Sequence, residues 1–156
     1  MRWTLTFSLA ALTATGAISQ EIAVCRAPAG KAYYHLAGMT GRANSGWSDD
    51  KISSGVTTLI RTGNKVDVLY VDTRNKPISS VQDGGNVVLL RQGSDSITVL
   101  VHYQDGSTTE IYSFFKEKDG THKFTQMQSK TGNSAMFPKS ALLVGTCDPI
   151  KFELLN

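Results

Sequence analysis

Long hydrophobic runs and clusters of one charge are both absent from this sequence. Its most apolar stretch, residues 5–12, is well short of the roughly 20 residues that a membrane-spanning helix needs. The 16 basic and 13 acidic residues are dispersed, for a net charge of +3, so the clustered Lys and Arg of a nucleic-acid-binding surface are missing. The spacings typical of a serine-nucleophile elbow, a P-loop, a dinucleotide site or an EF-hand are also lacking. We therefore predict no catalytic residues, no bound metal, no cofactor and no nucleic-acid partner.

The first 19 residues have the pattern of a secretory signal peptide. Arg2 supplies a positive start, residues 5–12 supply the apolar segment, and small residues follow. Cleavage after Ser19 would place small residues at both positions that the peptidase reads, and cleavage after Ala17 is the alternative. We predict a signal peptide at 1–19 and one domain at 20–156, without a transmembrane segment in the mature chain.

Cysteine is scarce: the chain has only Cys25 and Cys147, and no CxxC spacing that would favour a redox role. In an exported protein the two cysteines are expected to pair. Such a bridge would close a loop of about 120 residues and contribute roughly 4–5 kcal/mol in the chain-entropy account. The sequence also lacks Asn-x-Ser/Thr acceptors, which favours a bacterial periplasm, although secretion from the cell remains open.

Short runs rich in Val, Ile, Leu, Thr, Tyr and Phe alternate with Gly, Asp and Asn clusters from Val56 onward, as is typical of antiparallel β-structure. The predicted strands are 32–36, 56–61, 66–72, 86–91, 96–103, 108–116, 123–129, 141–146 and 150–154. Only 48–54 could form a turn or two of helix, ending at Gly55. We predict an all-β domain, a single small antiparallel β-barrel or sandwich of about 8–9 strands. The cysteine-linked first and last segments would seal its seam or pack across one end.

The strand register of the first central hairpin can be deduced from its turn. A four-residue loop at 92–95 would set Leu90 opposite Ile97 and Val88 opposite Val99. These side chains would then share one apolar face with Val101, and this face would be the core.

The next two hairpins extend the same face. A two-residue turn at 105–106 and a three-residue loop at 118–120, with Gly120 in the left-handed position, fix both registers. The expected pairs are Val101 with Glu110, Val99 with Tyr112, Ile97 with Phe114, Phe114 with Phe124, Tyr112 with Gln126, and Glu110 with Gln128. One end of the core face is therefore polar.

This polar end is the candidate ligand site. Its residues are Glu110, Tyr112, Phe114, Gln126 and Gln128. An apolar interior with a few convergent polar groups at one mouth is the usual composition of a ligand pocket in a small barrel. The alternative is that these groups only satisfy one another or reach solvent at the strand ends.

A second candidate lies in the polar, glycine-rich segment 41–55. Trp47 and Arg42 are the predicted partner-binding residues, because interface hot spots favour Trp, Tyr and Arg. The alternative is that Trp47 plugs one end of the barrel.

These patterns favour an exported binding protein without catalytic activity, in the periplasm or outside the cell. Its partner would be a protein, as for an enzyme inhibitor, or a small apolar molecule. A structural envelope component, marked by an exposed strand edge or self-association, and a small hydrolase or isomerase using Glu110 and Tyr112 are the other classes left open. A ligand carrier needs an empty interior, whereas an inhibitor can be packed solid.

Overall fold

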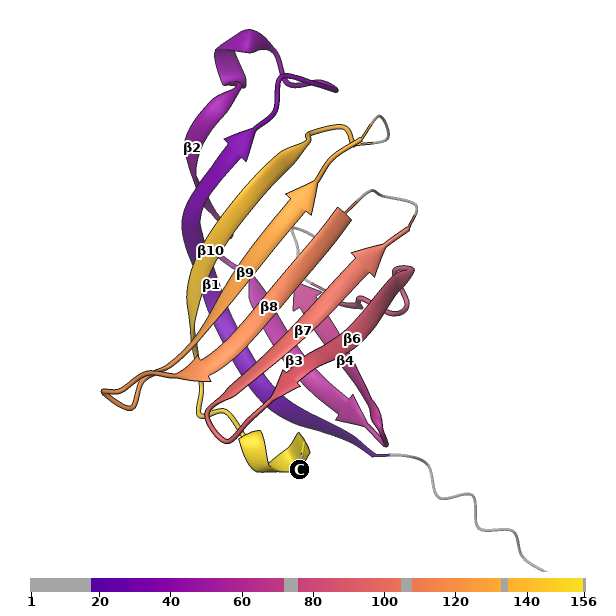
Figure 1. Ribbon diagram of the computed structural model, residues 1–156, viewed down its shortest axis with the longest axis vertical. Coiled ribbons are helices and arrows are strands. Elements are labelled where there is room, and N and C mark those ends of the chain that lie inside the picture. The colour runs from indigo at the N-terminus through magenta and orange to yellow at the C-terminus, as the bar shows by residue number, and fades with distance from the viewer. Residues whose placement is uncertain (1–17, 72–75, 105–107, 133–134, 156) are drawn as a thin grey trace, which may run out of the picture.

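The computed structural model describes residues 18–71, 76–104, 108–132 and 135–155. They form one strongly curled antiparallel sheet (Figure 1), which confirms the predicted all-β class. Its strands are β1 (Ser19–Tyr34), β2 (Gly46–Lys51), β3 (Val56–Thr62), β4 (Lys65–Val71), β5 (Pro77–Ser79), β6 (Gly85–Gln92), β7 (Ser96–Tyr103), β8 (Thr108–Lys116), β9 (His122–Lys130) and β10 (Lys139–Cys147). Two short 3-10 helices, η1 (Arg42–Asn44) and η2 (Phe152–Leu155), complete the described part. None of the described residues belongs to a helix that could cross a membrane.

The strands follow one another around the sheet in the order β5-β4-β3-β1-β10-β9-β8-β7-β6, and β2 pairs with β1 beside this path. The two ends of the path, β5 and β6, are joined by a turn at residues 80–84. Ser80 holds this turn against β4, because its backbone N–H and its hydroxyl both donate to the carbonyl of Val68, at 2.9 and 2.8 Å. The sheet is thus a half-barrel, open along the β5–β6 side.

Strand β1 is the longest element and changes partner along its length. Its first part pairs with β3 and its last part, from Ala29, with β2, while β10 lines its other edge. The register shifts between Arg26 and Ala29, where Ala27 has a φ of 50°. This bulge lets β1 leave β3, so that β1, β2 and β10 continue beyond the barrel as an extension, visible at the top of Figure 1.

The predicted disulfide between Cys25 and Cys147 is present, and the two residues stand directly opposite each other on β1 and β10. The bridge therefore joins the first and last strands of the barrel, as expected for a sealed seam. Arg26 on β1 also pairs with Asp148 at 2.8 Å just beyond it.

The lower half of the barrel is filled with side chains. Phe114 and Phe124 are stacked with their ring centroids 6.0 Å apart, and both are fully buried. The core they belong to also contains Ile22, Leu59, Val68, Ile97, Val99 and Val101.

The C-terminal segment packs across the lower end of the barrel, where Ile150 and Phe152 are buried. The predicted strand at 150–154 is wrong, because residues 152–155 form η2 instead. The segment follows the end of β10 along the edge of β1, where Asp148 donates to the carbonyl of Val24, but Pro149 has no N–H and cannot donate to a ladder. The segment is fixed by hydrogen bonds from Lys151 to Ile22 and from the backbone of Ile150 to His122 Nδ1, 2.9 and 2.7 Å long.

The predicted register of the β6–β7 hairpin is wrong. A bulge between Leu89 and Arg91 places Leu89, rather than Leu90, on the inner face, opposite Val99. As a result Val88 and Leu90 point outward and are 38% and 53% exposed. An extra residue in one strand reverses the facing of the residues beyond it.

The registers of β7–β8 and β8–β9 agree with the prediction at all six pairs. Gly120 has the expected left-handed conformation, with a φ of 88°. The turn at 105–106 that set the first of these registers lies outside the described residues.

The segment 48–54 is not helical, since β2 covers Gly46–Lys51 and only the turn at 52–55 remains. The β2 sequence is polar, but it lies along β1, where Tyr33 stands opposite Trp47. Pairing with β1 supplies the hydrogen bonds that a helix would have provided. The strand predicted at 32–36 is the final part of β1 and ends at Tyr34.

Candidate ligand-binding site

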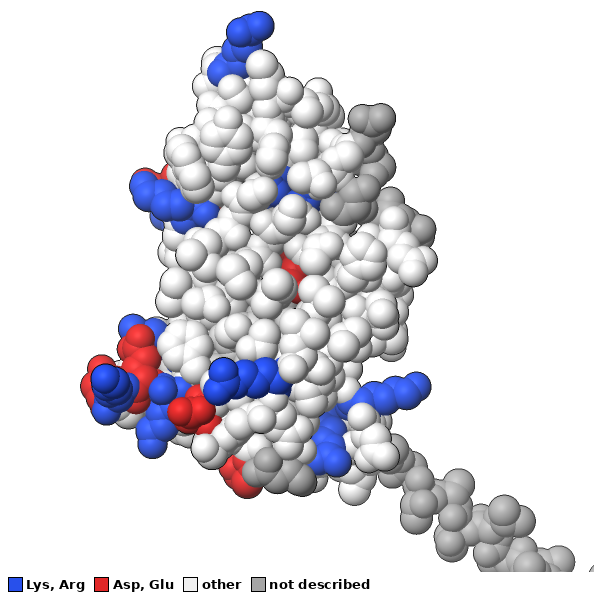
Figure 2. Space-filling view, in the orientation of Figure 1, with Lys and Arg blue, Asp and Glu red and all other residues white. Residues whose placement is uncertain are grey.

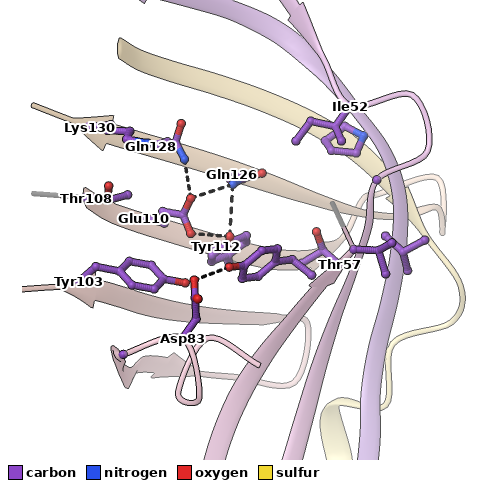
Figure 3. A pocket seen from close by; sticks show the side chains of 16 residues that line it. Ile52, Thr57, Asp83, Tyr103, Thr108, Glu110, Tyr112, Gln126, Gln128 and Lys130 are labelled. Carbon is purple, nitrogen blue, oxygen red and sulfur yellow. Dashed lines mark hydrogen bonds between the residues drawn. The ribbon is translucent and has the colours of Figure 1, made fainter. Parts of the chain in front are cut away.

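An open pocket of about 540 Å³ lies at the upper end of the barrel interior, above the aromatic core (Figure 3). It is lined by Pro28, Ile52, Gly55, Val56, Thr57, Tyr70, Val71, Asp83, Gly84, Tyr103, Thr108, Glu110, Tyr112, Gln126, Gln128 and Lys130. Strands β3, β4, β7, β8 and β9 all contribute to it. The volume is within the range of about 300–1,000 Å³ that is typical of small-molecule sites.

Glu110 is the centre of a hydrogen-bond network on the β8–β9 wall. Its carboxylate accepts from Tyr112 Oη at 2.7 Å and from the Nε2 atoms of Gln128 and Gln126 at 2.6 and 3.3 Å. Gln126 Nε2 also lies 3.2 Å from Tyr112 Oη. Glu110 is only 7% exposed. Cross-strand pairing of β8 with β9 produces this cluster, because Glu110 stands opposite Gln128, and Tyr112 opposite Gln126.

The pocket lining also contains two more tyrosines and a second carboxylate. Tyr70 Oη donates to Asp83 at 2.6 Å, and Tyr103 reaches toward the same region from the end of β7 (Figure 3). Burial raises the pKa of Tyr70, and the hydrogen bond to Asp83 adds to the shift. Burial also raises the pKa of Tyr103, and the negative charges of Glu110 and Asp83 act in the same direction. The pocket therefore favours neutral phenols.

Tyr112 also has a phenol with a raised pKa. Burial raises its pKa well above the usual value, and the charge of Glu110 raises it further. Since Tyr112 already donates to Glu110, it acts as a fixed hydrogen-bond donor rather than as an acid.

Four of the five predicted ligand-site residues line the pocket: Glu110, Tyr112, Gln126 and Gln128. Phe114 does not, because it is fully buried one pair below, where its ring stacks on Tyr112 at a centroid distance of 6.4 Å. Phe114 supports the pocket floor without facing the cavity.

The sequence interpretation missed Thr57, Tyr70, Asp83 and Tyr103, which complete the wall. The alternation of inward-facing and outward-facing side chains along the strands could have identified two of them. Tyr70 continues the inward series of Val66 and Val68, and Tyr103 lies two residues beyond Val101, also on the inner face. Asp83 lies in a turn, for which no periodicity exists.

Trp47 does not plug the barrel, because it is 75% exposed on the outer face of the extension. Its ring contacts Tyr33 edge-on at 5.5 Å, and it borders a shallow hollow of about 400 Å³. Met39 and Phe137, which are 67% and 52% exposed, line the same hollow. We call these three residues with Tyr33 the Trp47 surface. Arg42 lies nearby in η1, is exposed, and is not among the residues that line the hollow.

One polar group beside this surface lacks a hydrogen-bond partner within the described residues. Thr40 lines the hollow and is only 7% exposed, yet its hydroxyl makes no hydrogen bond in that part of the chain. A buried hydroxyl without a partner is costly, so a hydrogen-bonding group brought into the hollow would be stabilised there.

The outer face of the barrel carries a row of aliphatic side chains. Paired positions place Val88, Leu100, Ile111, Met127 and Leu142 side by side across β6 to β10. Figure 2 shows few charged side chains over the middle of this face and a larger group of them at its lower end. Met127 and Leu142 are 44% and 50% exposed.

The three histidines lie apart and contact different groups. His35 lies 3.2 Å from the Ser140 hydroxyl, His102 lies 3.0 Å from Thr109, and His122 accepts from Ile150. Among the described residues, no group of three or more His, Cys, Asp or Glu side chains could hold a metal ion.

Comparisons of the chain with protein-family models, with curated proteins and with solved structures find no match. The function is therefore inferred from the pocket and the surfaces described above.

Proposed function

We propose that this chain is an exported, non-catalytic binding protein that holds a small organic ligand in the pocket at the upper end of its barrel. The observation that carries the proposal is the division of the interior. The lower half is filled by Phe114, Phe124 and their neighbours, whereas the upper half leaves about 540 Å³ open. A rigid β-scaffold with a preformed pocket is well suited to holding a ligand without rearrangement. The polar wall favours an amphipathic ligand over a wholly apolar one.

Binding is favoured over catalysis by the state of the two residues that an enzyme would use. Glu110 already accepts hydrogen bonds on both oxygens, and Tyr112 has a raised pKa that makes it a poor proton donor near neutrality. A general acid or base works best when its pKa lies near the operating pH. The network is suited to fixing the orientation of a ligand.

Filling the pocket tests the proposal. Thr57 on β3 faces the cavity and is buried, while its neighbour Thr58 points to the outer face. We expect Thr57→Phe to abolish the binding of fragments that shift the amide NMR signals of β8 and β9 in the wild type, because the ring would occupy the cavity. Thr58→Phe is the matched control and should leave the binding unchanged.

Two results would contradict this function. One is a fragment library spanning neutral, cationic and anionic compounds that leaves every pocket amide signal in place. The other is fragment binding that survives Thr57→Phe with unchanged affinity in a folded protein.

A second candidate function is the binding of a protein partner at the Trp47 surface. The specific observation is the combination of exposed Trp47, Met39 and Phe137 with the hydroxyl of Thr40, which has no partner among the described residues. An exposed aromatic anchor beside an unsatisfied polar group is typical of interface hot spots. A partner that co-purifies with the wild type should be lost with Trp47→Ser and retained with Leu90→Ser, which removes an exposed side chain from another face.

A further inference from the structure

The charge of Glu110 is not matched by any cation within the described residues. No Lys or Arg nitrogen there lies within 4.0 Å of its carboxylate, since the ion pairs formed in that part of the chain use Asp49, Asp50, Glu117 and Asp148. Its three hydrogen-bond donors are a phenol and two amides, which are all neutral. A buried carboxylate is usually paired with a cation or metal.

Counting only the residues that the structure describes, the carboxylate also has one hydrogen-bonding position to spare. An ionised carboxyl group offers about four lone-pair sites, and Tyr112, Gln126 and Gln128 use three of them. A charged N–H donor at the remaining site would form a stronger hydrogen bond than a neutral donor. Within the described residues the site thus lacks a countercharge and a fourth hydrogen-bond donor, and a cationic ligand would supply both.

The rest of the lining is consistent with a positive ligand. Asp83 adds a second carboxylate to the described lining, against one ammonium group, that of Lys130. Tyr70, Tyr103 and Tyr112 present aromatic rings, which attract cations through their faces and also provide apolar area. Burial is the main cause of the raised pKa of Tyr103, and the negative charges of Glu110 and Asp83 add to the shift.

We infer that the ligand of this pocket carries a protonated amine that donates to Glu110, attached to an aromatic or apolar body that lies among the tyrosines. The inference rests on the proposed function and specifies the chemical class of the ligand. An ammonium group would supply the missing countercharge, and the amides of Gln126 and Gln128 would keep the carboxylate oriented toward it.

A matched set of three probes tests the inference. Tryptamine, tryptophol and indole-3-acetate share one ring and a short side chain, and end in an ammonium, a hydroxyl and a carboxylate. We expect tryptamine to bind the oxidised protein roughly 10-fold more tightly than tryptophol, the effect of one charge-assisted hydrogen bond. Indole-3-acetate should bind more weakly than both. Dissociation constants from amide NMR titrations measure the order.

Variants then locate the effect. Glu110→Gln should reduce the affinity for tryptamine to that for tryptophol, while Glu153→Gln, the same substitution on exposed η2 at the other end of the barrel, should change neither affinity. The probe comparison on the unaltered protein remains decisive even if Glu110→Gln does not fold.

The outcomes distinguish a failure of this inference from a failure of the proposed ligand-binding function. If tryptophol or indole-3-acetate shifts the pocket signals at an affinity equal to or above that of tryptamine, the amine inference is overturned and the binding function stands. If tryptamine keeps its advantage in folded Glu110→Gln, the inference is also overturned. If neither these probes nor the wider fragment library moves the pocket signals, both fail.

Discussion

At the scale of single residues, Tyr112 makes the stability of the barrel depend on pH. The phenol is almost fully buried and donates to Glu110, and both features disfavour its ionised form. Below its unfolded pKa near 10 the phenol is neutral in both states, so the folded state keeps its full stability. Above this pH the unfolded chain loses the proton while the folded protein retains it, and stability falls.

We therefore predict that the free energy of unfolding of the wild type declines above pH 10 more steeply than that of Tyr112→Phe. The difference in slope should be about half of 1.4 kcal/mol per pH unit near pH 10 and should approach the full value as the unfolded phenol becomes fully ionised. Urea titrations at several pH values between 9 and 11 measure it. The variant also loses the two hydrogen bonds of the phenol, to Glu110 and from Gln126. That loss lowers its free energy of unfolding by a similar amount at each pH, so parallel slopes would contradict the prediction.

At the scale of elements, the strands show why the sequence could predict some registers and not others. The hairpins from Ile97 to Gln128 alternate cleanly and have short turns rich in Asp and Gly, so counting residues gave the correct pairs. The β6 strand is apolar on both faces, and nothing in its alternation indicates that Leu90 is bulged. A single extra residue in such a strand cannot be recognised from its amino-acid composition.

Strand β2 was not predictable for a different reason. Its sequence from Gly46 to Lys51 lacks β-branched residues, and it is a strand because the edge of β1 beyond the bulge at Ala27 offers it a partner. Trp47 was consequently expected in a loop. The polar cluster around Glu110 was predictable because it follows from β8–β9 register alone, whereas Asp83 reaches the pocket through a turn.

The bulge in β6 leads to a testable prediction about the stability of two leucine variants. Leu89 faces the interior and Leu90 the solvent, so Leu89→Ala should lower the free energy of unfolding by about 1–2 kcal/mol, the cost expected for a partly buried leucine. Leu90→Ala should change it by less than about 0.5 kcal/mol. Chemical denaturation of both variants measures the two losses in free energy of unfolding. A larger loss for Leu90→Ala would support the register expected from the sequence instead.

At the scale of the whole molecule, the disulfide fastens the first strand of the barrel to the last. Cys25 and Cys147 are separated by 122 positions in the sequence, and they form the first pair of the ladder between β1 and β10, which continues to Tyr34 and Lys139. Because the open side of the half-barrel lies at β5 and β6, the bridge secures the closed side, where both chain ends converge.

We predict that replacing both cysteines with alanine lowers the free energy of unfolding by about 4–5 kcal/mol, since the unfolded chain gains the freedom of a very long loop. Thermal unfolding of the double variant, beside wild type with and without reductant, measures the loss. Reduced wild type should match the variant. A variant as stable as the oxidised protein would show that the β1–β10 pairing alone holds the two ends.

Both ends of the described chain emerge at the same pole, opposite the pocket. Ser19 begins β1 beside Thr62, and η2 lies across the same end of the barrel (Figure 1). A tether attached at either terminus would therefore leave the mouth facing away from its support. The domain could be immobilised on a sensor chip or fused to a carrier through the N- or the C-terminus, with equal access for the ligand in both orientations.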